Sequence, residues 1–147
     1  MERIINCRLS WFLEANDLFS KSQCDCLDHV TKLDTFIHNS FIRNHHTIAV
    51  FFDIEKAFDT TWRFGILRDL FDYGLRGHLP LFVKNFLHLR NFKVCVGSSL
   101  PDNFIQHCGV PQGSILSPTL FALKINKIVK VLSPNISSSL YVDDLAI

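Results

Sequence analysis

The sequence lacks an apolar run long enough to cross a membrane. Its longest runs, such as IAVFF at residues 48–52, fall far short of the roughly 18 residues that a membrane helix needs. No signal peptide is evident, and the five cysteines are odd in number and scattered, which argues against a disulfide framework. We therefore expect an intracellular protein, nuclear or cytoplasmic, with reduced thiols and no membrane partner.

An excess of charge of either sign is missing too. The chain has 15 lysines and arginines against 14 aspartates and glutamates, so its net charge does not indicate a polyanionic partner. Binding of a nucleic acid would have to use a local patch. Cys24, Cys26 and His29 could begin a zinc site, but no second pair of ligands follows at a suitable spacing.

Apolar residues are abundant, at 48% of the chain with 14 phenylalanines, beside an ordinary 20% of charged residues. A chain of 147 residues with this composition is expected to form one globular domain that buries roughly 70% of its unfolded surface. Helical spacing of apolar residues predicts helices over residues 5–13, 27–41, 62–71, 79–87 and 117–132. Gly74 is the expected stop of the third, and Ser117 the expected N-cap of the last.

Strands are expected between these helices. The continuous apolar run at residues 47–53 predicts a strand covered on both faces. Alternation over residues 92–108 predicts a hairpin with its turn at 97–102, and residues 139–142 and 145–147 flank a predicted turn at Asp143 and Asp144. This order of elements predicts an α+β fold in which an antiparallel sheet packs on helices.

Three acids stand at the ends of these strands. If the strands are neighbours, Asp53, Asp143 and Asp144 converge, and like charges about 4 Å apart repel by ~4 kcal/mol at an effective dielectric of ~20. Protons or metal ions must then enter. Carboxylates without nearby imidazole or thiolate suit Mg²⁺, and a pair of such ions supports in-line nucleotidyl transfer. The alternative is ordinary turn and helix-capping chemistry.

The motifs around these acids resemble a known family. AVFFDIEKAFDTTW at residues 49–62, GVPQGSILSPTLF at 109–121 and YVDD at 141–144 resemble the palm motifs of reverse transcriptases. LSWFLE at residues 9–14 and FDIEKAFDTTWRFGILRDL at 52–70 are similar to non-LTR retrotransposons of the jockey group. The resemblance implies a palm with part of the fingers and no thumb: residues 1–46 partial fingers, and 47–147 palm, truncated after YVDD.

The resemblance also implies an activity, RNA-directed DNA synthesis from dNTPs on an RNA template with a DNA primer. It implies two Mg²⁺ ions, for which Mn²⁺ could substitute, and it gives Asp53, Asp143 and Asp144 as catalytic residues and metal ligands. The Ile54 carbonyl would be a further metal contact. Phe58 would be the steric gate against a ribose 2′-hydroxyl, or else a core aromatic.

The loop GVPQG has a physical logic of its own. Its glycines let the backbone approach a ligand closely, and Gln112 beside Gly113 offers an amide to the nucleotide or template base; the alternative is a common turn. Lys56 and Arg63 could touch phosphates, but lone basic residues beside a helix are usually solvated.

The sequence departs from the family pattern in the fingers. SQCDCLDHV at residues 22–30 replaces a segment resembling G-F-R-x-G-R-S-T, whose arginine would contact the triphosphate. We also expect no thumb after Ile147 and no endonuclease domain before Met1, and therefore a chain that is inactive alone. The alternative is a non-enzymatic remnant that binds nucleic acid weakly or associates through an open sheet edge. The sequence does not indicate the oligomeric state.

Overall fold

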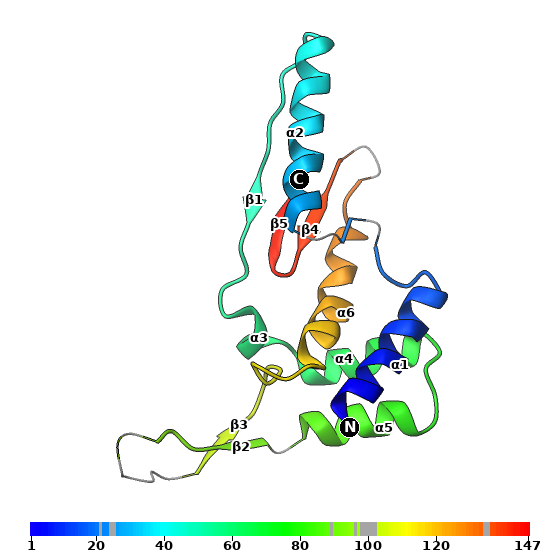
Figure 1. The fold of residues 1–147 in the computed structure, drawn as a ribbon, viewed down its shortest axis with the longest axis vertical. Helices are drawn as coiled ribbons and strands as arrows, with labels where there is room; N and C mark the ends of the chain where they lie inside the picture. Colours follow the sequence, from blue (N-terminus) through cyan, green and yellow to red (C-terminus); the bar gives the residue numbers. More distant parts are fainter. Residues whose placement is uncertain (21, 24–25, 89, 96, 98–102, 134–135) are drawn as a thin grey trace. The chain divides into compact units, whose positions relative to one another are not determined.

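A computed structural model describes residues 1–147 except 21, 24–25, 89, 96, 98–102 and 134–135 (Figure 1). Helices and antiparallel strands alternate along it, which confirms the predicted α+β class. The helices are α1 (Glu2–Ala15), α2 (Cys26–Ile42), α3 (Ala57–Thr60), α4 (Arg63–Asp72), α5 (His78–Leu87) and α6 (Ser117–Val129). The strands are β1 (Phe51–Phe52), β2 (Arg90–Phe92), β3 (Phe104–Gln106), β4 (Ser139–Tyr141) and β5 (Asp144–Ala146).

The chain forms two compact units. Unit 1 comprises residues 1–11 and 56–124, and unit 2 comprises residues 12–55 and 125–147, so α1 and α6 each contribute residues to both. The predicted boundary between fingers and palm at residue 46 was drawn from sequence motifs, and the two compact units do not divide the chain there. It therefore stays a prediction.

Unit 1 is built on α4 and α5, which pack against each other. Their apolar spacing puts Ile66, Leu70, Val83 and Leu87 in the core. Helix α4 ends where predicted, because Gly74 takes a φ of 82° and lets the backbone N–H of the next residue bond to Leu70. Two charged groups are held in this interior.

These charged groups are Asp69 of α4 and Lys124 of α6. Asp69 is fully buried, and the Nζ atom of Lys124 lies 3.1 Å from its Oδ2 atom. The Lys124 side chain keeps 25% of its surface exposed. Removal of either partner would leave a charge with poor access to water, so the pair is a sensitive point of unit 1.

Unit 2 contains a three-stranded antiparallel sheet in the order β1-β5-β4. Helix α2 lies along β4 (Figure 1). Leu140 and Leu145 face each other in the β4–β5 register and are both buried. The ladder between β1 and β5 continues through a reciprocal pair of backbone hydrogen bonds between Val50 and Ile147.

The prediction of a long strand covered on both faces is wrong. β1 is limited to Phe51 and Phe52, which are 63% and 49% exposed, and Ile48 before it is 86% exposed. β1 is exposed because it lies at the edge of the sheet. An apolar run in the sequence does not by itself reveal whether both faces of a strand are covered. Helix α2 forms as predicted, but Leu27, Val30 and Phe41 on its apolar side are exposed.

The predicted hairpin of unit 1 is confirmed. Strands β2 and β3 pair in antiparallel register, with Phe92 opposite Phe104. Most of the predicted turn, residues 98–102, lies outside the described residues. The hairpin leads away from the end of α5 and returns to the GVPQG loop (Figure 1).

Candidate functional site

The predicted carboxylates all belong to unit 2, where strand register brings their backbones together. Phe51 pairs with Ala146 and Phe52 with Leu145, so the next step of the same antiparallel register sets Asp53 across from Asp144. Residues opposite each other in such a ladder have Cα atoms about 4.5–5.5 Å apart. Two acids that are 91 positions apart in the sequence therefore end neighbouring strands.

The turn that carries the third acid differs from the prediction. It consists of Val142 and Asp143, while Asp144 already begins β5 opposite Tyr141. Val142 has a φ of 53°, and only this first central residue is in the left-handed region, as in a type II′ turn, whose first position is ordinarily glycine. A β-branched residue is strained there.

The three carboxylates are open to water to different degrees. Asp53 and Asp144 are exposed, and Asp143 is half-buried. The strand ends reach solvent because β1 is at the edge of the sheet. Ile54 is half-buried just beyond the strand.

The same carboxylates are the natural candidates for a metal site. Within the described part of the chain, no group of three or more His, Cys, Asp or Glu side chains is arranged to hold a metal ion. Mg²⁺ needs few protein ligands because water and phosphate complete its shell, and oxygen donors suit it. Asp53, Asp143 and Asp144 supply oxygen donors of the kind that Mg²⁺ prefers, although their side chains do not form such a group. The suggested zinc ligand Cys24 lies outside the described residues, as does the side chain of Cys26.

The remaining predicted site residues gather in unit 1. Phe58, Gln112 and Gly113 line one hollow of about 480 Å³, together with residues of the start of α6. The ring of Phe58 stacks on the buried ring of Phe121, with centroids 4.9 Å apart. Phe58 is thus both a packed aromatic and a wall of the hollow. The exposed Gln112 donates from Nε2 to Oδ1 of Asp59 at 3.1 Å.

The GVPQG loop is fixed against the segment that carries Phe58. The backbone N–H groups of Gly109 and Val110 donate to the carbonyls of Thr61 and Phe58. Gly109 has a φ of 78°, and a Cβ atom there would overlap the carbonyl oxygens of Phe58 and Asp59. Only glycine permits this close approach.

Arg63 anchors the residues that lead into this loop. Its guanidinium donates to the backbone carbonyls of Gln106, Cys108 and Gly109 at 2.7, 3.0 and 2.6 Å. Burial lowers the pKa of Arg63; the charge of Arg90 lowers it further, and Cys108 opposes the shift. The interpretation of Arg63 as simply solvated is wrong, because three of its five N–H groups donate within the protein.

The far side of the loop is held by the first residues of the chain. Oε2 of Glu2 accepts hydrogen bonds from the Ser114 hydroxyl at 2.8 Å and from the Ile115 N–H at 3.2 Å. Ser117 begins α6 as predicted, but its hydroxyl donates to the Pro111 carbonyl at 2.7 Å and so ties the helix to the loop. Glu2 and the loop-holding role of Arg63 were not predicted, since no local spacing in the sequence links either residue to the loop.

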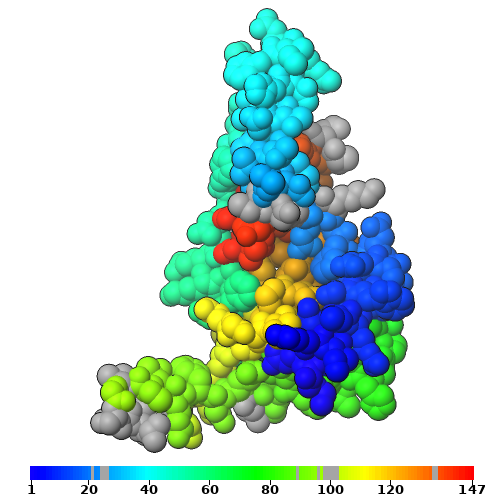
Figure 2. All heavy atoms as spheres, viewed as in Figure 1, coloured from blue at the N-terminus to red at the C-terminus, as the bar shows by residue number. Residues whose placement is uncertain are grey.

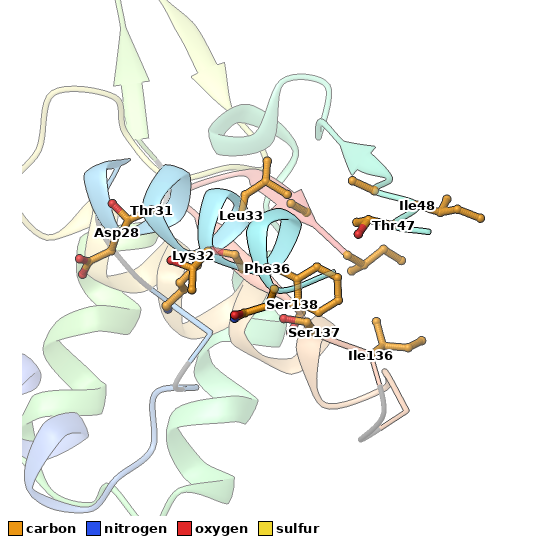
Figure 3. Close-up of a pocket in the computed structure, with 16 residues that line it drawn as sticks. Asp28, Thr31, Lys32, Leu33, Phe36, Thr47, Ile48, Ile136, Ser137 and Ser138 are labelled. Carbon is orange, nitrogen blue, oxygen red and sulfur yellow. The ribbon is translucent and has the colours of Figure 1, made fainter. Parts of the chain in front are cut away.

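A larger cavity of about 540 Å³ lies in unit 2, and Figure 3 shows Phe36, Thr47 and Ser138 around it. Its walls come from α2, residues 47–49, residues 136–139 and the end of β5. The predicted site residues, all of them described, are not among those that line it.

In the described residues, no helix is long and apolar enough to span a membrane.

Comparison with known proteins agrees with the motifs. The family model described as reverse transcriptase (RNA-dependent DNA polymerase) matches residues 1–147. The RNA-directed DNA polymerase from mobile element jockey of Drosophila melanogaster is 30% identical over 163 aligned positions, covering 100% of this chain and 17% of that protein. The probable RNA-directed DNA polymerase from transposon BS of the same species is 33% identical over 100 residues, 66% of this chain and 11% of that protein. The chain belongs to the reverse transcriptase (RNA-dependent DNA polymerase) family.

Proposed function

We propose that this chain carries the nucleotidyl-transfer site of an RNA-directed DNA polymerase that uses dNTPs, an RNA template and a DNA primer. The observation that supports the proposal is the β1–β5 register, in which Phe52, directly before Asp53, pairs with Leu145, directly after Asp144. The chain spans 11% and 17% of the two relatives named above, so the activity of the whole protein is part of the proposal.

The carboxylates of Asp53, Asp143 and Asp144 would hold two divalent ions, Mg²⁺ or Mn²⁺, with the Ile54 carbonyl as a further contact. When bound, such ions supply electrostatic stabilisation of the attacking and leaving oxygens. Both Asp53 and Asp144 are exposed, so neither needs to be uncovered before a metal–nucleotide complex arrives.

Unit 1 would supply the pocket for the nucleotide. Phe58 is the proposed steric gate, because its position against Phe121 prevents the ring from moving away from a 2′-hydroxyl. Gln112 and Gly113 share the hollow with Phe58 and would contact the base or sugar. Glu2 and Arg63 are positioning residues, because they act only through the loop.

Mn²⁺ binding, followed by electron paramagnetic resonance, tests the carboxylates independently of catalysis. We expect binding to weaken at least tenfold in Asp53→Asn and in Asp143→Asn, since each loses a charged oxygen donor. Asp34→Asn, an exposed acid on α2, is the matched control and should bind as the parent does. Parent-like binding by both site variants would refute the assignment.

Primer extension on RNA tests the activity itself. Extension should require Mg²⁺ or Mn²⁺ and disappear in Asp53→Asn, while Phe58→Ala should incorporate ribonucleotides more readily relative to deoxyribonucleotides. Unchanged sugar selection in Phe58→Ala would leave that residue with its packing role only.

The alternative function is a non-enzymatic remnant that associates through the open edge of β1. The exposure of Phe51 and Phe52 favours it, because an apolar edge strand pairs readily with another chain. Analytical ultracentrifugation separates the two: association that Phe51→Lys abolishes, without metal binding or primer extension, would support the remnant.

A further inference from the structure

The part of unit 1 that follows α4 has an unusual charge pattern. From residue 73 to residue 101 the sequence contains Arg76, Lys84, Arg90 and Lys93 and no aspartate or glutamate. The near-neutral net charge of the chain hides this stretch. A polyanion would find complementary charge here.

The hairpin in this stretch presents an aromatic pair to solvent. Phe92 and Phe104 are opposite each other in the β2–β3 register, so their side chains share one face. Their ring centroids are 5.5 Å apart, and each side chain is about half exposed, at 49% and 48%. Figure 2 shows the yellow-green atoms of the hairpin open to solvent on the face in view.

The aromatic surface continues from the hairpin to α5. Arg90 is two residues before Phe92 in β2 and therefore shares its face. Its Cζ atom lies 4.9 Å from the centroid of the Phe86 ring, which in turn stacks on Phe82. We call Phe82, Phe86, Arg90, Phe92 and Phe104 the aromatic row. The Arg90 guanidinium thus contacts the Phe82–Phe86 pair, and its residue shares a strand face with Phe92 of the second pair.

We propose that the aromatic row binds single-stranded nucleic acid. Unpaired bases stack on exposed rings and on guanidinium planes, while a basic surface follows the phosphates. Phe92 and Phe104 would take the bases, and the exposed Lys93, which follows β2 directly, would contact the phosphate backbone. A duplex hides its base faces and cannot stack in this way.

A second copy of the chain is a poorer occupant of the same surface. Face-to-face contact of two such hairpins would bring the Arg90 charges of the two copies onto one interface, and like charges across an interface are unfavourable. The proposal goes beyond the proposed function and uses none of its residues, although a polymerase would gain a place to hold unpaired template.

Fluorescence anisotropy with the full chain and a labelled uridine oligoribonucleotide of about 12 nucleotides tests the row at low salt. Removal of one stacking ring should weaken binding by about 5- to 100-fold in Phe92→Ala and in Phe104→Ala. Phe92→Tyr keeps a stacking face and should bind as the parent does. Phe41→Ala removes a 74% exposed ring from α2 and is the matched control.

Two further measurements make the proposal easy to overturn. Lys93→Gln should lower the slope of log affinity against log salt by about 0.7, the value for one phosphate of a single strand. The same sequence as a duplex should bind at least about tenfold more weakly, because its bases are not free to stack. Equal binding of the duplex, or unchanged binding in both alanine variants, would refute the proposal.

Mn²⁺ binding by the row variants separates this proposal from the proposed function. Phe92→Ala should lose affinity for the oligoribonucleotide while it binds Mn²⁺ as the parent does. If Phe92→Ala converts an associating chain to a monomer without changing RNA binding, the row is a contact between copies and the proposal is wrong.

Discussion

The two units position their candidate functional residues by different means. In unit 1 the GVPQG loop is held by side chains on both sides, Arg63 at its start and Glu2 near its end. In unit 2 Asp53 is placed by a short backbone ladder beside the exposed Phe51 and Phe52. The difference teaches that side-chain contacts preorganise the GVPQG loop of unit 1, whereas strand register places Asp53 in unit 2.

This difference predicts that single substitutions cost more stability in unit 1 than in unit 2. The largest effect should come from Asp69→Ala, which leaves the Lys124 charge partly buried without its carboxylate. We expect a loss of about 3–5 kcal/mol in the free energy of unfolding, measured with urea. Asp34→Ala removes the acid of an exposed pair with His38 and should change stability by less than about 0.5 kcal/mol. Similar losses in the two variants would contradict the description of unit 1.

The next largest effect compares two glycines of the GVPQG loop, of which one is crowded by neighbouring atoms and the other is not. Gly109→Ala must accept a φ of 78° and an overlap with two carbonyl oxygens, and should lose about 3 kcal/mol. Gly113→Ala has a similar φ of 82° with no atom within 4 Å of the added Cβ, and should lose only about 1–2 kcal/mol. Thermal unfolding of the two variants measures the difference directly. Equal losses would show that the close approach of the backbones is relieved cheaply.

A smaller effect is expected at Arg63. Arg63→Met removes the donors to the Gln106, Cys108 and Gly109 carbonyls and should cost about 2 kcal/mol. Arg63→Lys keeps the charge but loses the planar arrangement of donors, so it should recover less than half of that loss. Full recovery by lysine would mean that charge, rather than hydrogen-bond geometry, holds the loop.

The smallest effect, and one of opposite sign, belongs to unit 2. Val142→Gly should stabilise the protein by about 1 kcal/mol, because glycine accepts the left-handed conformation that strains valine. Chemical denaturation against the parent checks the sign. Destabilisation would show that the valine side chain has a packing role that outweighs its strain.

The helices and strands were easier to predict from the sequence than the exposure of their side chains. The helices and the hairpin were predicted from apolar spacing, since periodicity depends only on neighbouring residues. The exposure of apolar side chains on β1 and α2 could not be predicted, because the sequence pattern is the same whether that face is buried by another element or left open to solvent. For the candidate site, the motifs led to Phe58, Gln112 and Gly113, which share a hollow.

The partners of Arg63 could not be predicted in the same way. They are backbone carbonyls more than 40 positions away, and a carbonyl carries no residue identity that a sequence could display. The turn was misplaced by one residue for a related reason, since Val142 gives no local signal of a positive φ.

Arg63 contacts backbone carbonyls rather than side chains, and this affects how the sequence of residues 106–109 can diverge. Arg63 is indifferent to which residues occupy positions 106 and 108, because every residue type offers the same oxygen. Selection that preserves the loop would then act on Arg63 and Gly109 while leaving the residue types at positions 106 and 108 open to drift. In a collection of related copies, these two positions should vary widely while Arg63 and Gly109 stay fixed.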